Sequence, residues 1–109
     1  MYAEASLLGG GGNGAAAFKQ VVDRAYGASN PAAPTYNLAG VKAERRRELA
    51  TEGWDRFTDL VRWGDIQAAM TAVGKTDFNI NRDKLLPIPA AEIRLSNNLL
   101  TQNPNYPTN

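Results

Sequence analysis

The sequence predicts a mostly α-helical protein, and three observations support this fold class. Apolar residues recur at steps of three and four through roughly the first two thirds of the chain, glycines end the apolar runs, and only the last third lacks this pattern. We expect a helical hairpin over residues 1–27, a long helix followed by a short helix over residues 37–73, and an irregular packed tail, rich in Pro and Asn, over residues 74–109. With 109 residues, the chain has room for one domain.

Residues 1–27 have the pattern of two helices joined by glycine. The Ala/Leu run of residues 2–8 is followed by four glycines, which are too flexible to continue a helix. Asn13 suits an N-cap, and Gly27 suits a C-terminal stop. The expected buried face of the second helix has the spacing i, i+3, i+4 and i+7 and consists of Phe18, Val21, Val22 and Ala25. The hairpin has the size of one tetratricopeptide-type repeat, which needs neighbours to bury its apolar face.

The middle of the chain has the pattern of a longer helix. Asn37 suits an N-cap, and apolar residues follow at helical spacing, so we expect one long helix or a kinked pair over residues 38–63. Gly53 lies inside this segment and indicates either a kink or the close approach of another backbone. A short helix is expected over residues 65–73, ended by Gly74.

After Gly74 the pattern changes. Residues 75–109 contain four Pro and seven Asn, and only residues 90–95, entered through Pro89, have a helical pattern. The tail is nevertheless more apolar than a disordered segment. We therefore expect it to pack on a surface larger than the predicted helices offer, which favours the end of a longer protein.

The composition narrows the chemistry that the chain can perform. It contains no His and no Cys, which excludes Ser/His/Asp catalysis, Cys/His zinc sites and disulfides, and we expect no cofactor and no metal site. The 12 basic and 11 acidic residues give a net charge of +1, so no strong field draws the chain to nucleic acid or to an anionic membrane. No stretch approaches the ~20 apolar residues of a membrane span, and residues 1–12 lack the pattern of a signal peptide.

Charged residues on the long helix are spaced to pair along it. The run of residues 45–47 is three consecutive arginines, which suggests nucleic-acid binding, but Glu44 and Glu48 flank it, so we interpret it as a salt-bridged face. Asp55 and Asp59 are one turn apart, as in a paired acid and base or a metal site. Arginines within one turn keep such carboxylates ionised, so we expect a structural role.

Trp54, Phe57 and Trp63 lie on or beside the same helix. Aromatic rings can stack on sugar rings or on bases. At helical spacing beside Leu60 and Val61, however, they are more typical of a core. We therefore expect all three rings to be core residues.

Six blocks of the sequence carry a resemblance to a known family. They are YAEA (2–5), VVDRAYG (21–27), ERRRELATEG (44–53), RFTDLVRWG (56–64), LLPIPAAEI (85–93) and LTQNPNY (100–106). In this order they resemble the C-terminal part of the SusD/RagB family of Bacteroidetes outer-membrane lipoproteins. The chain departs from the family pattern where Trp54 and Asp55, instead of one residue, separate Gly53 from Arg56, and where Asn105 replaces a common Gly.

The resemblance implies a tetratricopeptide-containing helical fold and a non-catalytic role. Family members are longer, and they lie at the cell surface, where they cover a SusC-like TonB-dependent transporter and pass it oligosaccharides or other nutrients. Their membrane attachment is a lipid anchor that this chain lacks, so we expect residues 1–109 to be the C-terminal portion of such a protein. Family ligand sites lie largely in variable loops outside these blocks, so the resemblance transfers no glycan-binding residue.

We expect the matched blocks to be architectural. Our hypothesis is that a semi-buried ionic lattice fastens the long helix to the tail, while Pro87–Pro89 fixes the turn of the tail. The residues of this lattice are Arg45, Glu48, Glu52, Arg56, Asp59 and Arg62.

The preferred function is therefore non-catalytic glycan binding in a SusC/SusD-type uptake complex. The alternative is a helical-repeat module that binds another protein through the hairpin and the tail. A carboxylate-based glycoside hydrolase is a third class, and it has no support beyond acids already paired with arginines. Retardation by a polysaccharide distinguishes the first function from the second.

Overall fold

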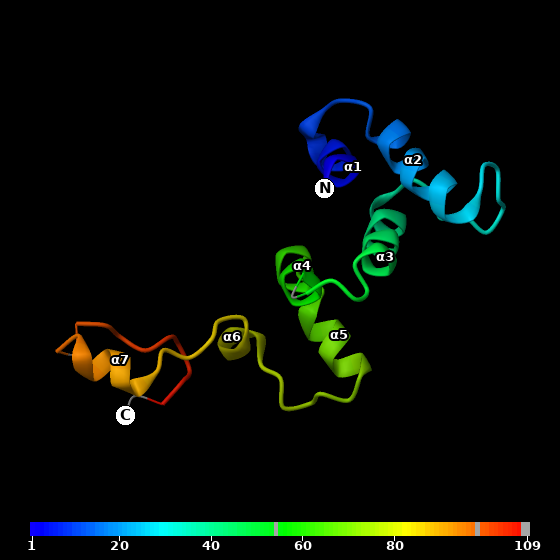
Figure 1. Ribbon diagram of the computed structural model, residues 1–109. Coiled ribbons are helices and arrows are strands. Elements are labelled where there is room, and N and C mark those ends of the chain that lie inside the picture. The colour runs from blue at the N-terminus through cyan, green and yellow to red at the C-terminus, as the bar shows by residue number, and fades with distance from the viewer. Residues whose placement is uncertain (54, 98, 108–109) are drawn as a thin grey trace. The chain divides into compact units, whose positions relative to one another are not determined.

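The computed structural model describes residues 1–53, 55–97 and 99–107, and it confirms a mostly α-helical fold (Figure 1). None of these described residues forms a β-strand. The chain divides into two units, Met1–Gly53 and Trp54–Asn109. The first unit contains α1 (Tyr2–Ala5), η1 (Ser6–Gly10), α2 (Gly14–Tyr26) and α3 (Leu38–Glu48). The second unit contains α4 (Asp55–Trp63), α5 (Ile66–Ala72), α6 (Ile80–Asp83) and α7 (Ala90–Leu95).

The α1 and α2 helices form the predicted hairpin. α1 continues into the wider helical turn η1, and the chain then turns through Gly9, Gly11 and Gly12, all of which have positive φ. Glycine adopts a positive φ without steric penalty, so the glycine run makes the turn as predicted. The side chain of Asn13 caps α2 by accepting a hydrogen bond of 3.0 Å from the backbone N–H of Ala16.

The core of the first unit lies between α2 and α3. Phe18 and Val22 are buried on the predicted face of α2, and Val41 of α3 packs with them. The ring of Tyr36 lies 5.6 Å from that of Phe18, centroid to centroid, and its hydroxyl donates a hydrogen bond of 3.1 Å to the carbonyl of Ala3. The loop before α3 is thereby attached to both helices of the hairpin.

Residues 38–63 form two helices and not one long helix. α3 begins after Asn37, whose side-chain oxygen accepts a hydrogen bond of 2.8 Å from the N–H of Gly40. Gly53 ends the turn that follows, at a φ of 65°, and a Cβ added there would meet no atom within 4 Å. The positive φ of Gly53 suits the turn, because glycine adopts this conformation without steric penalty. Trp54, a predicted core residue, lies outside the described residues.

In the second unit α4 and α5 are in contact, and each contributes a buried apolar residue, Leu60 and Ile66. The predicted core position of Phe57 is wrong: its side chain is 39% exposed, in the first turn of α4 and away from the junction with α5. Trp63 is half-buried, and the guanidinium of Arg62 lies 4.8 Å from its ring centroid. This cation–π contact covers the indole with a charged group.

The tail contains a helix that the sequence pattern did not predict, α6. Asn79 accepts a hydrogen bond from the N–H of Asn81 at 2.9 Å, and Asp83 accepts one from the N–H of Asn79 at 2.7 Å. These reciprocal bonds stabilise a helix too short to show apolar periodicity. The helix α7 lies where it was predicted, with Pro89 before its first turn and Ile93 buried.

Side chains of the LTQNPNY block (100–106) hold the backbone of the LLPIPAAEI block (85–93) in place. The Gln102 side chain accepts a hydrogen bond of 2.8 Å from the N–H of Ile88 and donates one of 2.8 Å to its carbonyl. One amide thus satisfies both backbone groups of Ile88, as a neighbouring strand would. Two further side chains donate to the carbonyls of the residues just before Pro87. Asn103 Nδ2 donates to Leu86 O at 2.6 Å, and the Tyr106 hydroxyl donates to Leu85 O at 2.9 Å.

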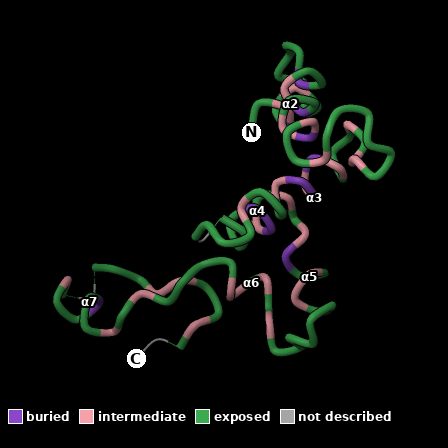
Figure 2. The backbone as a smooth tube through the Cα atoms, turned by 45° about the vertical axis from the view of Figure 1, so that its right-hand side comes forward, coloured by how far each residue is buried: buried purple, intermediate pink, exposed green. Residues whose placement is uncertain are grey.

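The tail nevertheless leaves large apolar side chains uncovered. Leu86, Leu95 and Leu99 are 82%, 77% and 86% exposed, and Figure 2 shows exposed positions along most of the segment. The backbone of the tail is therefore held by hydrogen bonds within the tail, while much of its apolar surface faces solvent. Packing of this tail on a further surface remains a prediction.

Candidate functional site

The first unit contains a buried carboxylate that links two helices. Glu44 of α3 is 3% exposed, accepts a hydrogen bond of 3.2 Å from the Tyr26 hydroxyl of α2, and pairs with Arg47 at 3.0 Å. Desolvation, followed by the hydrogen bond to the carboxylate, raises the pKa of Tyr26 above its ordinary value of 10.0. A carboxylate engaged in this way suits a structural role.

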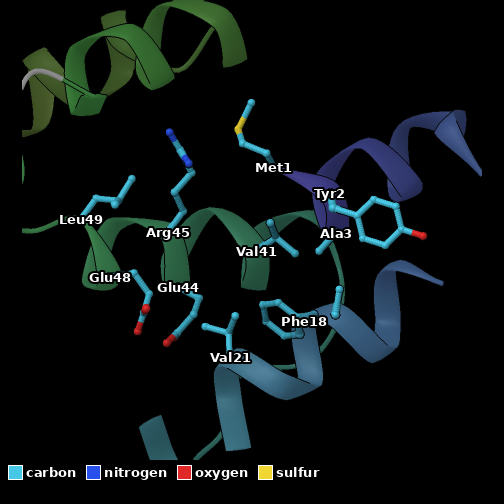
Figure 3. A pocket seen from close by; sticks show the side chains of 11 residues that line it. Met1, Tyr2, Ala3, Phe18, Val21, Val41, Glu44, Arg45, Glu48 and Leu49 are labelled. Atoms are coloured by element: carbon cyan, nitrogen blue, oxygen red, sulfur yellow. The ribbon is translucent and has the colours of Figure 1, made fainter. Parts of the chain in front are cut away.

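A hollow of about 290 Å³ lies among α1, α2 and α3 (Figure 3). Phe18, Val21 and Val41 give it an apolar lining. Arg45 and Glu48 lie at its edge and extend from α3 in opposite directions. The lining suits an apolar side chain better than a hydroxyl-rich ligand.

The predicted lattice residues of the first unit lie on α3 and in the turn after it. Glu48 pairs with Arg24 of α2, a residue outside the predicted set. Glu48 extends away from Arg45, its predicted partner at i–3 (Figure 3). Glu52 is exposed in the turn.

The other lattice residues lie on α4. Asp59 is 5% exposed and accepts a hydrogen bond of 2.8 Å from Nε of Arg62, so this predicted pair forms. Arg56 is exposed in the first turn of the helix. Glu52 lies in the turn that follows α3 and Arg56 lies in α4, so the two residues belong to different units. The lattice as a whole remains a hypothesis.

Several structural side chains were missed from the sequence. Glu4 of the YAEA block is 2% exposed and was not singled out from the sequence, and Glu44, expected only to flank the arginine run, is 3% exposed. Tyr26 and Arg24 reach α3 from the VVDRAYG block. The signal that could have found these residues is their place in the blocks shared with a family, because contacts between residues far apart in the chain leave no periodic pattern.

Neither a cluster of metal-ligating side chains nor a membrane-spanning helix occurs in the part of the chain that the structure describes. Across residues 1–53, 55–97 and 99–107, no three acidic side chains gather into a group that could hold a metal ion. The helices within the same ranges all lack the length and the hydropathy needed to cross a membrane.

The comparisons with known proteins identify the family. The chain matches the model of the SusD family over residues 1–106, a range that contains all six blocks, and it therefore belongs to that family. Family members are non-catalytic binding proteins, generally outer-membrane lipoproteins, and the family is associated with glycan binding in nutrient uptake. Comparison of the chain with curated proteins and with solved structures found no match.

Proposed function

We propose that this chain is the C-terminal portion of a non-catalytic glycan-binding protein of an outer-membrane uptake complex. The observation that carries the proposal is the family match over residues 1–106. The intact protein would be attached to the cell surface by a lipid anchor outside this chain. It would take an oligosaccharide from the medium and transfer it to a SusC-like TonB-dependent transporter.

In this proposal the matched blocks maintain the architecture. Residues 1–27 form a tetratricopeptide-like hairpin, residues 37–73 supply the following helices, and residues 74–109 form a packed tail. The buried acids Glu44 and Asp59, each bonded to a neighbouring arginine, support this role. The six-residue ionic lattice would hold these segments together in the intact protein.

The alternative function is a helical-repeat module whose partner is another protein. The exposed leucines of the tail favour it, since apolar surface of this kind marks protein–protein contacts. In this case the tail would dock on a protein, and glycan binding would be absent.

Affinity electrophoresis of the intact protein tests the proposed function. Gels containing starch, dextran, inulin or galactomannan should retard the protein in at least one case, relative to a gel without polysaccharide. A protein retarded by none of them, but retained by an immobilised transporter, supports the alternative. A reducing-sugar assay with the same polysaccharides should show no hydrolysis, and release of sugar would contradict the non-catalytic role.

A further inference from the structure

The turn between η1 and α2 ends in an Asn–Gly pair. Asn13 is exposed and is followed by Gly14. Asn is a chemically labile residue, and a following glycine favours its deamidation because no Cβ hinders the attacking backbone nitrogen. We propose that Asn13 is a latent deamidation site that the folded first unit keeps unreactive, so that modification of Asn13 records the opening of this turn. The inference is independent of the proposed function.

The reaction is a cyclisation of the Asn side chain onto the next backbone nitrogen. The nitrogen of Gly14 attacks Cγ of Asn13, a C–N bond forms as the bond from Cγ to the side-chain nitrogen breaks, and ammonia leaves with the proton of the backbone amide. Water then opens the succinimide ring at either carbonyl, which leaves aspartate or isoaspartate. The five-membered ring closes only when the nitrogen of Gly14 lies on the same side of the Cα–C bond as Cβ of Asn13.

The folded backbone holds the reacting atoms apart. Asn13 has a ψ of 69°. In an L-residue with this ψ, the nitrogen of the next residue lies on the opposite side of the Cα–C bond from Cβ. Ring closure therefore requires a large rotation about this bond, which would separate α2 from the turn that precedes it.

Three hydrogen bonds oppose this rotation. The side chain of Asn13 accepts from the N–H of Ala16 at 3.0 Å, which keeps its oxygen at the start of α2. The backbone N–H of Asn13 donates to the Tyr2 hydroxyl at 3.0 Å. The N–H of Gly14, the attacking group, donates to Oγ of Ser6 at 3.3 Å. The pair can react only after these bonds open together, so local opening sets the rate.

The packing of the turn explains why a reactive pair occurs here. A Cβ added to Gly14 would lie 2.2 Å from the Tyr36 hydroxyl and 2.5 Å from Cβ of Ser6, so a larger residue would displace both. Asn13 supplies the N-cap of α2. Both members of the pair thus have a structural role, and the same contacts that require them also hold them in an unreactive geometry.

Peptide mapping of the intact protein measures the reaction. Trypsin cleaves after Lys19, and Asn13 is the single Asn within residues 1–19, so the mass shift from exchange of NH2 for OH identifies the site. A synthetic peptide of residues 9–19, in the same buffer and at the same temperature, gives the rate of the unprotected pair. Circular dichroism checks that each protein is folded during the incubation.

Two variants each remove one of the bonds that hold the turn. Tyr2→Phe removes the acceptor of the Asn13 N–H, and Ser6→Ala removes the acceptor of the Gly14 N–H. The matched controls are Tyr106→Phe and Ser96→Ala, which remove hydroxyls that bond the backbone in the tail.

We expect Asn13 of the folded wild type to react about tenfold or more slowly than Asn13 of the peptide, since only the opened fraction reacts. Tyr2→Phe and Ser6→Ala should each accelerate the reaction about two- to tenfold, the effect of losing one hydrogen bond, and the controls should react like the wild type. A peptide that keeps its amide refutes the site. Equal rates for folded protein and peptide, or variants that react no faster than their controls, refute protection by the fold.

Discussion

The hydroxyl of Tyr26 donates a hydrogen bond of 3.2 Å to the buried carboxylate of Glu44 and so joins α2 to α3. The pair of Arg24 with Glu48 links the same two helices one turn further along α3. The two contacts connect the VVDRAYG and ERRREL blocks, which explains physically why both blocks belong to one structural unit.

The Tyr26–Glu44 contact predicts a pH dependence of stability at alkaline pH. Because the pKa of Tyr26 is raised above 10.0 in the folded state, the folded chain keeps a proton that the unfolded chain loses. Its contribution to stability should be complete below about pH 10 and should decline as the pH rises above that value. Urea unfolding across this range should show the decline in the wild type and a smaller decline in Tyr26→Phe. Equal slopes for the two proteins would contradict the prediction.

The amide of Gln102 should be essential to the order of the tail. In Gln102→Glu the carboxylate can still accept from the N–H of Ile88, but it meets the carbonyl of Ile88 without a proton to donate. We expect the free energy of unfolding to fall by about 1 to 3 kcal/mol at neutral pH, measured by urea denaturation. Gln20→Glu, on the exposed side of α2, introduces the same charge as a control and should have little effect. A loss in the control as large as that in Gln102→Glu would assign the effect to charge alone.

The ionic lattice is tested at two of its exposed members, Glu52 and Arg56. Glu52→Ala or Arg56→Ala in the intact protein should lower stability by more than the ~0.2 to 1 kcal/mol of an exposed ion pair if the lattice hypothesis is right. Arg46→Ala is the matched control, because Arg46 is an exposed arginine of α3 outside the lattice. Thermal unfolding of the three variants gives the comparison. Losses no greater than that of Arg46→Ala would refute the lattice.

The accuracy of the sequence-based prediction follows the range of the interactions. The caps at Asn13 and Asn37 were predicted correctly because a cap depends on residues within one turn. The helix α6 was missed although its caps are equally local, because four residues are too few to show a 3.6-residue period. Phe57 was misplaced because periodicity identifies the apolar face of a helix and does not tell how much of that face a neighbour covers.

The sequence by itself determined the helical class, the glycine turns and the family, since each depends on neighbouring residues or on the order of short blocks. The tertiary structure decided which acids are buried, which residue pairs with Glu48, and that the side chain of Gln102 bonds the backbone of Ile88. The bond between Gln102 and Ile88 spans 14 positions, and that between Arg24 and Glu48 spans 24. Contacts over such distances leave no periodic signal in a single chain, because only folding brings their atoms together.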